Sequence, residues 1–440
     1  MSRVYIAFLG TNDYLPCTYF SDDKEAEDVR FVQEATLSFF CNGWTRNDRI
    51  LIFTTDEAEK KNWQNNGHKN WKTGKDLKRK GLKKSIEDLN LFASVQNVSI
   101  PEGKSELEIW DIFRIVLDQL NQGDEISFDI THAFRSIPML AIVVLNYAKI
   151  MKKITLHGIY YGAFEVLGSL PEAKKIPLKE RRVPVLNLTS FDQLMEWSFA
   201  INRFIEAGDA SHISRLANQS ARSVLSETRG ADRSAHILRR IARDLDKFTK
   251  ALSTCRGTEI GGIVSSLNGS IDELENSDYV PPEPFQPIIR QIKDQIVRFK
   301  GDDVILDGIS ASKWCLNHNL VQQGYTILQE TLLSYFIVKI GQDQENQKYR
   351  EIAGQAVTIY LKKIVKTKWK ETAADNEKIT REFLIFYQDK AELVKIYREL
   401  SNDRNDLNHA GHKKNPMRAE KFSNNLSKFL SRIGKYIDLI

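Results

Sequence analysis

Residues 125–150, EISFDITHAFRSIPMLAIVVLNYAKI, contain a strand, a short loop and a helix in direct succession. The strand is apparent at residues 125–128, and the helix has Ser136 to cap it and Pro138 in its first turn. Free backbone N–H groups and the positive end of a helix dipole favour an anion at such a junction. Three loop residues add hydrogen-bond donors there: Thr131, His132 and Arg135. The sequence therefore predicts a site for a phosphate-bearing ligand.

Strands and helices alternate over the first 190 residues or so. Short apolar runs predict the strands, and apolar residues at helical spacing predict the helices. The predicted strands cover residues 4–9, 50–53, 95–100, 126–130 and 154–160. The predicted helices run through Val29, Val32, Thr36 and Phe39, through 107–120 and through 139–150. This alternation predicts an α/β domain with a mostly parallel, doubly wound, Rossmann-like sheet.

Three loops lie where such a sheet binds its ligands, beyond the carboxyl ends of the strands. They are residues 10–13, 129–135 and 160–163. We expect Asp129 to orient its loop rather than to touch an anionic ligand. Simpler roles stay open for the others, since Thr131 and His132 can cap the next helix and Tyr161 can belong to the core. The three spaced glycines of a dinucleotide site are absent from the sequence, so NAD binding is not supported.

Composition indicates a globular protein of two to three domains. The chain has 440 residues, of which 42% are hydrophobic and 28% charged, and its net charge is +5. This mild basicity is compatible with nucleic acid as a partner without establishing it. The four cysteines are scattered, which predicts reduced core thiols in a cytoplasmic protein and no zinc site. The sequence has no apolar run long enough for a signal peptide or a membrane span, so no membrane is expected.

Residues 60–84, KKNWQNNGHKNWKTGKDLKRKGLKK, interrupt the alternation and are rich in lysine, asparagine and glycine. One interpretation is a solvated loop or insertion. The other is a surface that binds RNA, with Trp63 and Trp71 available to stack on bases. We favour the first interpretation.

Only helices are predicted after the strand signals stop near Arg182. We therefore place a domain boundary after residue 185, between an α/β domain at residues 1–185 and an all-α region at residues 186–440. The predicted helices cover residues 191–207, 210–225, 233–252, 287–299, 310–340, 351–362, 382–410 and 416–439.

A polar motif, RNDLNH at residues 404–409, lies late in the helical half. Arg404 continues the apolar stripe of its predicted helix. A guanidinium on such a stripe is costly unless it is paired or serves a site. The simpler interpretation is an arginine that extends to solvent or forms a salt bridge at an interface.

Two histidines follow Arg404 within one helical turn of each other. Asn405, His409 and His412 are spaced to share one helix face, and Gly411 is expected to end the helix. Arg404 lies roughly 140° around an ideal helix from His409. The two side chains therefore meet only if Arg404 reaches round, if the helix distorts, or if a second copy of the helix completes the site.

An arginine and a histidine suit the cleavage of RNA without a metal. The ribose 2′-hydroxyl attacks the adjacent phosphate when a base removes its proton, and histidine titrates near neutral pH. Arginine stays charged and stabilises the phosphorane oxygens. The sequence shows no cluster of carboxylates typical of a two-metal site.

The peptide at residues 129–135 resembles the signature of CARF-domain proteins of type III CRISPR systems, which commonly reads Asp-x-Thr-His-Gly. Ala133 stands here in place of the usual glycine and disfavours a positive φ. Other segments are similar as well: FLGTNDY at 8–14, Thr54-Thr55-Asp56 with Asn62-Trp63 downstream, and GIYYGA at 158–163. In the second half, Arg404-Asn405-x-x-x-His409 is similar to the HEPN ribonuclease motif.

The resemblance implies a CARF sensor domain followed by a helical linker and an all-α HEPN ribonuclease domain. CARF domains dimerise and bind a cyclic oligoadenylate across their two-fold axis, and HEPN domains dimerise to build one composite site from two Arg–His pairs. The resemblance places the ring at Gly10, Thr11, Asn12, Thr131, His132, Ala133, Phe134, Arg135, Tyr161 and Gly162. It places RNA cleavage at Arg404, Asn405 and His409.

The resemblance also implies the partners. We expect single-stranded RNA as the substrate, a homodimer or a larger assembly of dimers, no metal, no cofactor and no required stable contact with the interference complex. Ring size does not follow from the sequence, although cyclic tetraadenylate is favoured over cyclic hexaadenylate as the activator.

Two alternatives stay open. The protein can be a ligand-responsive binding or regulatory protein without ribonuclease activity, although no convincing helix-turn-helix is evident. The CARF domain can also degrade its own ring, although the sequence offers no evident general base for that reaction.

Overall fold

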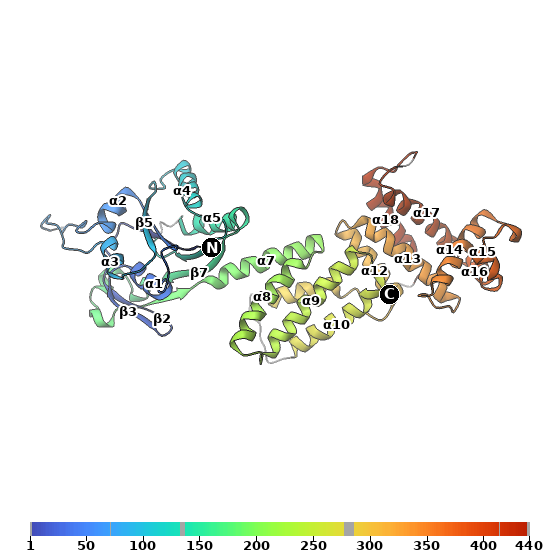
Figure 1. The fold of residues 1–440 in the computed structure, drawn as a ribbon, viewed down its shortest axis with the longest axis horizontal. Helices are drawn as coiled ribbons and strands as arrows, with labels where there is room; N and C mark the ends of the chain where they lie inside the picture. The colour runs from blue at the N-terminus through green and yellow to red at the C-terminus, as the bar shows by residue number, and fades with distance from the viewer. Residues whose placement is uncertain (1, 71, 133–136, 277–285, 413, 438–440) are drawn as a thin grey trace. The chain divides into compact units, whose positions relative to one another are not determined.

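The chain folds into two compact units, Met1–Gln193 and Leu194–Ile440. The computed structural model describes residues 2–70, 72–132, 137–276, 286–412 and 414–437 (Figure 1). The expected domain boundary after residue 185 lies inside the last strand of the first unit.

The first unit is built on one eight-stranded sheet among the described residues (Figure 1). In spatial order the strands are β3 (Lys24–Val29), β2 (Cys17–Ser21), β8 (Arg182–Asn187), β7 (Thr155–Gly162), β6 (Glu125–Asp129), β1 (Arg3–Leu9), β4 (Arg49–Thr54) and β5 (Ser94–Ser99). The run from β7 to β5 is parallel throughout, as predicted. Strand β8 pairs parallel to β2 but antiparallel to β7, and β2 and β3 form an antiparallel hairpin.

Helices cover both faces of this sheet, which confirms the doubly wound architecture. Alternate residues of a strand point to opposite faces. Val4, Ile6 and Phe8 of β1 therefore pack with α4 (Glu106–Asp118) and α5 (Ile137–Lys152). The intervening residues Tyr5, Ala7 and Leu9 pack with α1 (Val32–Phe40) and α3 (Leu82–Asp88). Shorter helical segments are α2 (Asp56–Ala58), Glu59–Trp63, Phe164–Leu167, α6 (Leu170–Ala173) and Leu178–Glu180.

Three strands were not predicted: β2, β3 and β8. Strand β3 reads KEAEDV and lies mostly exposed at the sheet edge, so it has no apolar alternation to detect. Val29, expected in the first helix, ends this strand instead, and α1 begins at Val32. Strand β8 contains Pro184, which suppresses a strand signal, so strands do not stop at Arg182 as expected.

The second unit is largely helical, as predicted. Its helices are α7 (Thr189–Ala207, which begins in the first unit), α8 (Ser211–Glu227), α9 (Arg233–Ser253), α10 (Gly257–Glu275), α11 (Gln286–Ile296), α12 (Val304–Asn317), α13 (Val321–Lys339), α14 (Gln347–Lys362), α15 (Glu371–Asp375), α16 (Glu377–Asp389), α17 (Ala391–Asn408) and α18 (Ala419–Ile433). A short 3-10 turn spans Lys366–Lys368. One apolar core joins α7 to α12, and a second joins α12 to α18.

Three helix predictions were wrong in detail. The helix expected at 310–340 divides into α12 and α13 around Asn319, whose φ is +59°. The helix expected at 382–410 divides into α16 and α17 at Lys390. Helix α10 was not predicted, because its four glycines weaken the helical pattern.

The cysteines Cys17, Cys41 and Cys315 are buried, Cys255 is half-buried, and all four are free thiols. Within the described part of the chain, no helix is long and apolar enough to cross a membrane.

Candidate functional site

The first two expected ligand loops lie at the ends of β1 and β6, but the third, residues 160–163, is mostly strand, since β7 runs to Gly162 and pairs there with β8. Strands β1, β6 and β7 are neighbouring parallel strands. Their carboxyl ends therefore meet at one edge of the sheet. Thr131 joins the signature loop to the end of β7, and His132 joins it to the first loop.

Asp129 holds the signature loop from inside the sheet. Its carboxylate is 1% exposed and accepts hydrogen bonds from the Thr131 amide (2.9 Å), the Thr36 hydroxyl (2.8 Å) and the Tyr5 hydroxyl (3.1 Å). Burial raises the pKa of Asp129, while these hydrogen bonds oppose that rise. The carboxylate is fully engaged, in agreement with the expectation that Asp129 orients the loop.

Thr131 connects the signature loop to the third loop. Its hydroxyl oxygen accepts a hydrogen bond from the Gly162 amide at 2.8 Å. Gly162 has no room for a side chain, since a Cβ there would lie 2.5 Å from Cγ2 of Val32. Two residues that the resemblance assigned to the ring therefore lie in direct contact.

His132 connects the signature loop to the first loop. Its ring stacks on Tyr14 with the ring centroids 4.1 Å apart. Burial lowers the pKa of His132 to about 3, so the imidazole is neutral at physiological pH. Its Nε2 is buried and has no hydrogen-bond partner among the described residues. His132 is therefore a neutral, stacked imidazole rather than a positive charge.

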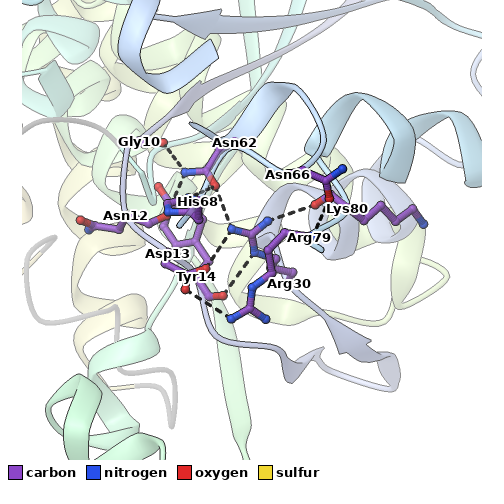
Figure 2. Close-up of polar contacts among 10 residues, drawn as sticks. All are labelled: Gly10, Asn12, Asp13, Tyr14, Arg30, Asn62, Asn66, His68, Arg79 and Lys80. Atoms are coloured by element: carbon purple, nitrogen blue, oxygen red, sulfur yellow. Dashed lines mark hydrogen bonds and ion pairs between the residues drawn. The ribbon is translucent and has the colours of Figure 1, made fainter. Parts of the chain in front are cut away.

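The first loop is held by Asn62, a residue of the turn after β4 (Figure 2). The Asn62 amide donates to the carbonyls of Gly10 and Asn12, both at 2.8 Å. Gly10 has no space for a side chain, because a Cβ would lie 2.4 Å from the Tyr14 hydroxyl. The Asn12 side chain is exposed and Thr11 is half-buried, so both can be reached from solvent.

Arg30 reinforces the same loop and was missed from the sequence (Figure 2). Its guanidinium is nearly buried and bonds to Asp13 (3.1 Å), to Oδ1 of Asn62 (3.0 Å) and to the carbonyl of Tyr14 (3.3 Å). Burial lowers the pKa of Arg30, and Asp13 partly offsets this effect. No local sequence signal distinguishes Arg30, because the partners of its guanidinium are 16 or more positions away in the chain.

Tyr161 carries an unexpected acidic neighbour. Its hydroxyl donates to both carboxylate oxygens of Glu165 at 2.9 Å. Burial, with a contribution from Glu165, raises the pKa of Tyr161 to about 12, so the phenol stays protonated. The third loop therefore carries a negative charge close to the expected ligand. Ala133, Phe134 and Arg135 lie outside the described residues.

The polar motif of the second unit lies on the last turn of α17. Arg404 is half-buried, and its Nε is buried without a hydrogen-bond partner among the described residues. Its positive charge acts to lower the pKa of the Cys255 thiol and of Tyr397, and so opposes the rise that burial causes in both. Asn405 and His409 are exposed. The arginine and the histidine therefore differ in exposure within one chain.

Acidic residues of the motif turn anchor it to its neighbours. Asp406 is buried and accepts a hydrogen bond from the Met417 amide at 2.8 Å, which ties the loop after α17 to the helix. Asp403 accepts from Asn425 (3.1 Å) and from the Tyr325 hydroxyl (3.3 Å). The turn that presents Arg404, Asn405 and His409 is thus fixed from its other side.

Helix α17 ends two residues earlier than expected. His409 is its cap, and its amide bonds to the Asn405 carbonyl at 3.1 Å. Ala410 and Gly411 then take positive φ values of 50° and 76°. His412 therefore lies beyond the helix and does not share a helical face with Asn405 and His409, contrary to expectation.

A cavity of about 660 Å³ lies between α17 and α18, on the Asp403 side of the motif. Its lining includes Glu399, Asp403, Lys428 and Arg432, and none of the three motif residues lines it. Across the residues that the structure describes, no group of three or more histidine, cysteine or acidic side chains is arranged to hold a metal ion.

Comparisons with known proteins agree with this architecture. Residues 4–165 match the family model described as "CRISPR system endoribonuclease Csx1, CARF domain". Residues 193–301 match the model described as "CRISPR-associated protein MJ1674, second domain". The CRISPR-associated protein MJ1674 of Methanocaldococcus jannaschii is 28% identical over 237 residues, which is 53% of this chain. The match spans only 32% of that relative's length. Residues 4–165 therefore form a CARF domain, and the chain is a CARF-containing protein homologous to a CRISPR-associated protein.

Proposed function

We propose that this protein is a metal-independent, single-stranded endoribonuclease of type III CRISPR antiviral defence that a cyclic oligoadenylate activates. The observation that carries the proposal is the continuity of the three loops of the CARF domain. Tyr14 stacks on His132, and Thr131 bonds to Gly162, so one contiguous surface crosses three strand ends. A ring ligand needs such a surface, because its nucleotides are spread over several loops at once.

Buried side chains hold the described parts of the ligand site in place before any ring arrives. Asp129, Asn62 and Arg30 are buried and hold the loops from below. A preorganised site spends less binding free energy on ordering loops. Exposed Asn12 and the half-buried Thr11 and Thr131 then supply polar groups for the adenylate ring.

RNA cleavage is assigned to Arg404, Asn405 and His409. His409 is exposed at the end of α17, where its imidazole can take the proton of a ribose 2′-hydroxyl. That hydroxyl then attacks the adjacent phosphate and expels the 5′-oxygen, leaving a 2′,3′-cyclic phosphate. Arg404 stabilises the charge of the phosphorane, and Asn405 positions the phosphate. The unequal exposure of Arg404 and His409 supports a composite site built by two copies of α17 in a homodimer.

Ring binding regulates the reaction by shifting an equilibrium between arrangements of the two helical regions. A symmetric ligand on a two-fold axis suits a symmetric dimer. The ring has to bind one arrangement more tightly than the other to have this effect.

The substitution Arg404→Ala tests the assignment. We expect cleavage of single-stranded RNA to fall by two to three orders of magnitude, as for other groups that stabilise charge in a transition state. Ring affinity should stay unchanged. Arg398→Ala is the matched control, because Arg398 is an exposed arginine of the same helix. Cleavage that survives Arg404→Ala would refute the assignment while leaving ring binding open.

A further inference from the structure

Residues 60–84 form the most basic segment of the chain, and the proposed function leaves them without a role. The segment contains nine lysines, one arginine and one aspartate, so its net charge is +9. The whole chain carries +5, and +5 less +9 leaves −4 for all the other residues. The net positive charge of this protein therefore comes from one segment, which follows α2 and runs into the first turn of α3 (Figure 1).

The base of this segment is rigid. Trp63 is 7% exposed and packs in the core with Leu82 and Ile86. Gly67 and Gly81 are packed so closely on backbone atoms that a Cβ would lie 2.1 Å and 2.4 Å away, respectively. Burial of Trp63 contradicts the expectation that it stacks on RNA bases, and Trp71 lies outside the described residues.

The outer part of the segment is a turn held by backbone contacts. Lys69 and Asp76 pair as an antiparallel bridge, and the Asn70 amide bonds to the Lys75 carbonyl at 2.8 Å. Lysines on both sides of the turn project from this fixed frame.

Half of the cations in the segment are available for a partner. Four of them form ion pairs with carboxylates of the first unit: Lys61, Arg79, Lys80 and Lys84. Five others are exposed and form no ion pair with any described residue: Lys60, Lys69, Lys75, Lys78 and Lys83. Five solvated ammonium groups on a rigid base suit a ligand that carries many regularly spaced negative charges.

The segment is also tied to the first ligand loop (Figure 2). Arg79 pairs with Asp13 at 3.3 Å, and Nη1 of Arg30 donates to the Lys80 carbonyl at 3.0 Å. The Arg79 amide bonds to the Asn66 side chain at 3.0 Å, which closes the base of the turn. A ligand held by the lysines therefore lies on an element that shares Asp13 and Arg30 with the ring site.

We propose that residues 60–84 are an RNA-binding arm, which holds single-stranded RNA by its phosphates. Lysine binds phosphate as a point charge, and the release of counterions from the RNA drives binding without regard to sequence. With Trp63 buried, the contacts are made to the backbone rather than by stacking of that residue. The arm deepens the proposed function by giving its substrate class a docking surface, but it does not depend on cleavage.

The test measures RNA binding in the full-length His409→Ala protein without any ring. The probe is a fluorescent single-stranded RNA of about 20 nucleotides, followed by anisotropy at several salt concentrations. The arm variant combines Lys69→Glu, Lys75→Glu and Lys78→Glu. The control variant combines three exposed lysines of the same unit and the same charge change, Lys174→Glu, Lys175→Glu and Lys179→Glu.

We expect the arm variant to bind RNA at least tenfold more weakly and the control variant less than twofold more weakly. The slope of log K against log salt should fall by about two in the arm variant, because each lost phosphate contact removes roughly 0.7 for a single strand. Equal losses in both variants would show an effect of net charge alone and would overturn the proposal. Unchanged binding by the arm variant would overturn it as well.

Two further measurements separate RNA from other polyanions. Fluorescent cyclic tetraadenylate should bind the arm variant as tightly as the parent protein. A parallel loss of ring affinity would assign the lysines to the ring site instead. Poly-glutamate of equal charge should compete poorly with the RNA probe, and competition at equal charge concentration would overturn the preference for RNA. If the parent protein cleaves no RNA with either ring while the arm still binds RNA, the proposed function fails and the arm stands.

Discussion

The hydroxyl of Thr131 accepts a hydrogen bond from the amide of Gly162 at 2.8 Å, across 31 positions of the chain. The contact joins the loop that follows β6 to the last residue of β7. Both residues were predicted to bind the ring. The contact shows that Thr131 stabilises the conformation of the loop. Thr131 is therefore expected to affect a ligand through the shape of the site as well as through its hydroxyl oxygen.

Replacing Thr131 with valine should weaken the ring site. The change removes the acceptor of the Gly162 amide, and a buried donor left unpaired costs about 1–3 kcal/mol. We expect ring affinity to fall at least tenfold and the urea midpoint of unfolding to fall modestly. Thr131→Ser keeps the hydroxyl and should retain most of the affinity. A valine variant that binds the ring normally would show that the Thr131–Gly162 contact has no role in the site.

Replacing Asn62 with leucine should release the first loop. The amide makes two hydrogen bonds to the carbonyls of Gly10 and Asn12, and Oδ1 accepts from Arg30. Loss of all three leaves buried groups unpaired, so we expect about 2–4 kcal/mol of destabilisation by chemical denaturation. Ring binding should fall at least tenfold. Asn65→Leu is a control in the same segment, since Asn65 is exposed and bonds only to the Gly81 amide in the described contacts.

Replacing Glu165 with glutamine should strengthen ring binding. The Glu165 carboxylate lies 2.9 Å from the Tyr161 hydroxyl and adds negative charge near the expected phosphates. One like charge at about 4 Å in water is worth about 1 kcal/mol, which is roughly fivefold in affinity. Competition binding at 50 mM and 500 mM salt checks this, because the gain should shrink as salt screens the charge. No gain at low salt would place the ring phosphates away from the third loop.

Replacing His132 with phenylalanine should flatten the acid dependence of stability. Burial lowers the pKa of His132 to about 3 in the folded protein, whereas an unfolded histidine titrates near 6.5. Between those values the unfolded chain binds the extra proton, so this histidine removes stability as pH falls from about 6.5 towards 3. Phenylalanine keeps the stack on Tyr14 and cannot titrate. Urea unfolding from pH 7 to pH 4 should show a smaller loss in the variant, and identical profiles would contradict the burial of this imidazole.

The parallel core of the sheet was predictable because its strands are short, apolar and separated by helical patterns. Strand β1 and strand β4 are almost wholly buried, so their sequences read as continuous apolar runs. The hairpin of β2 and β3 was not predictable in the same way. Its outer strand is exposed, and its partner is set by long-range pairing with β8 rather than by any local pattern.

The ligand loops were predicted in position but not in internal structure. A strand that passes into a helix marks Thr131 and His132 from sequence alone. The support from Arg30 and Asn62 was not predictable, because it depends on contacts between residues far apart in the chain. Arg30 and Asn62 are separated by 32 positions, and Asn62 and Gly10 by 52. Glu165 was missed for another reason: it lies only four positions from Tyr161, and their contact depends on a 3-10 turn after β7 that the sequence did not predict.

Central to the proposed function is a ring on the CARF domain that turns on metal-independent RNA cleavage by His409. The most direct measurement follows cleavage of a fluorophore–quencher RNA in EDTA, with and without cyclic tetraadenylate or cyclic hexaadenylate. The parent protein is compared with His409→Ala and with His412→Ala, which changes an exposed histidine beyond the helix. The account predicts strong activation by one ring that His409→Ala abolishes and His412→Ala retains. Tight binding of a ring with no cleavage by the parent protein would contradict it and would leave the helical region with a binding role.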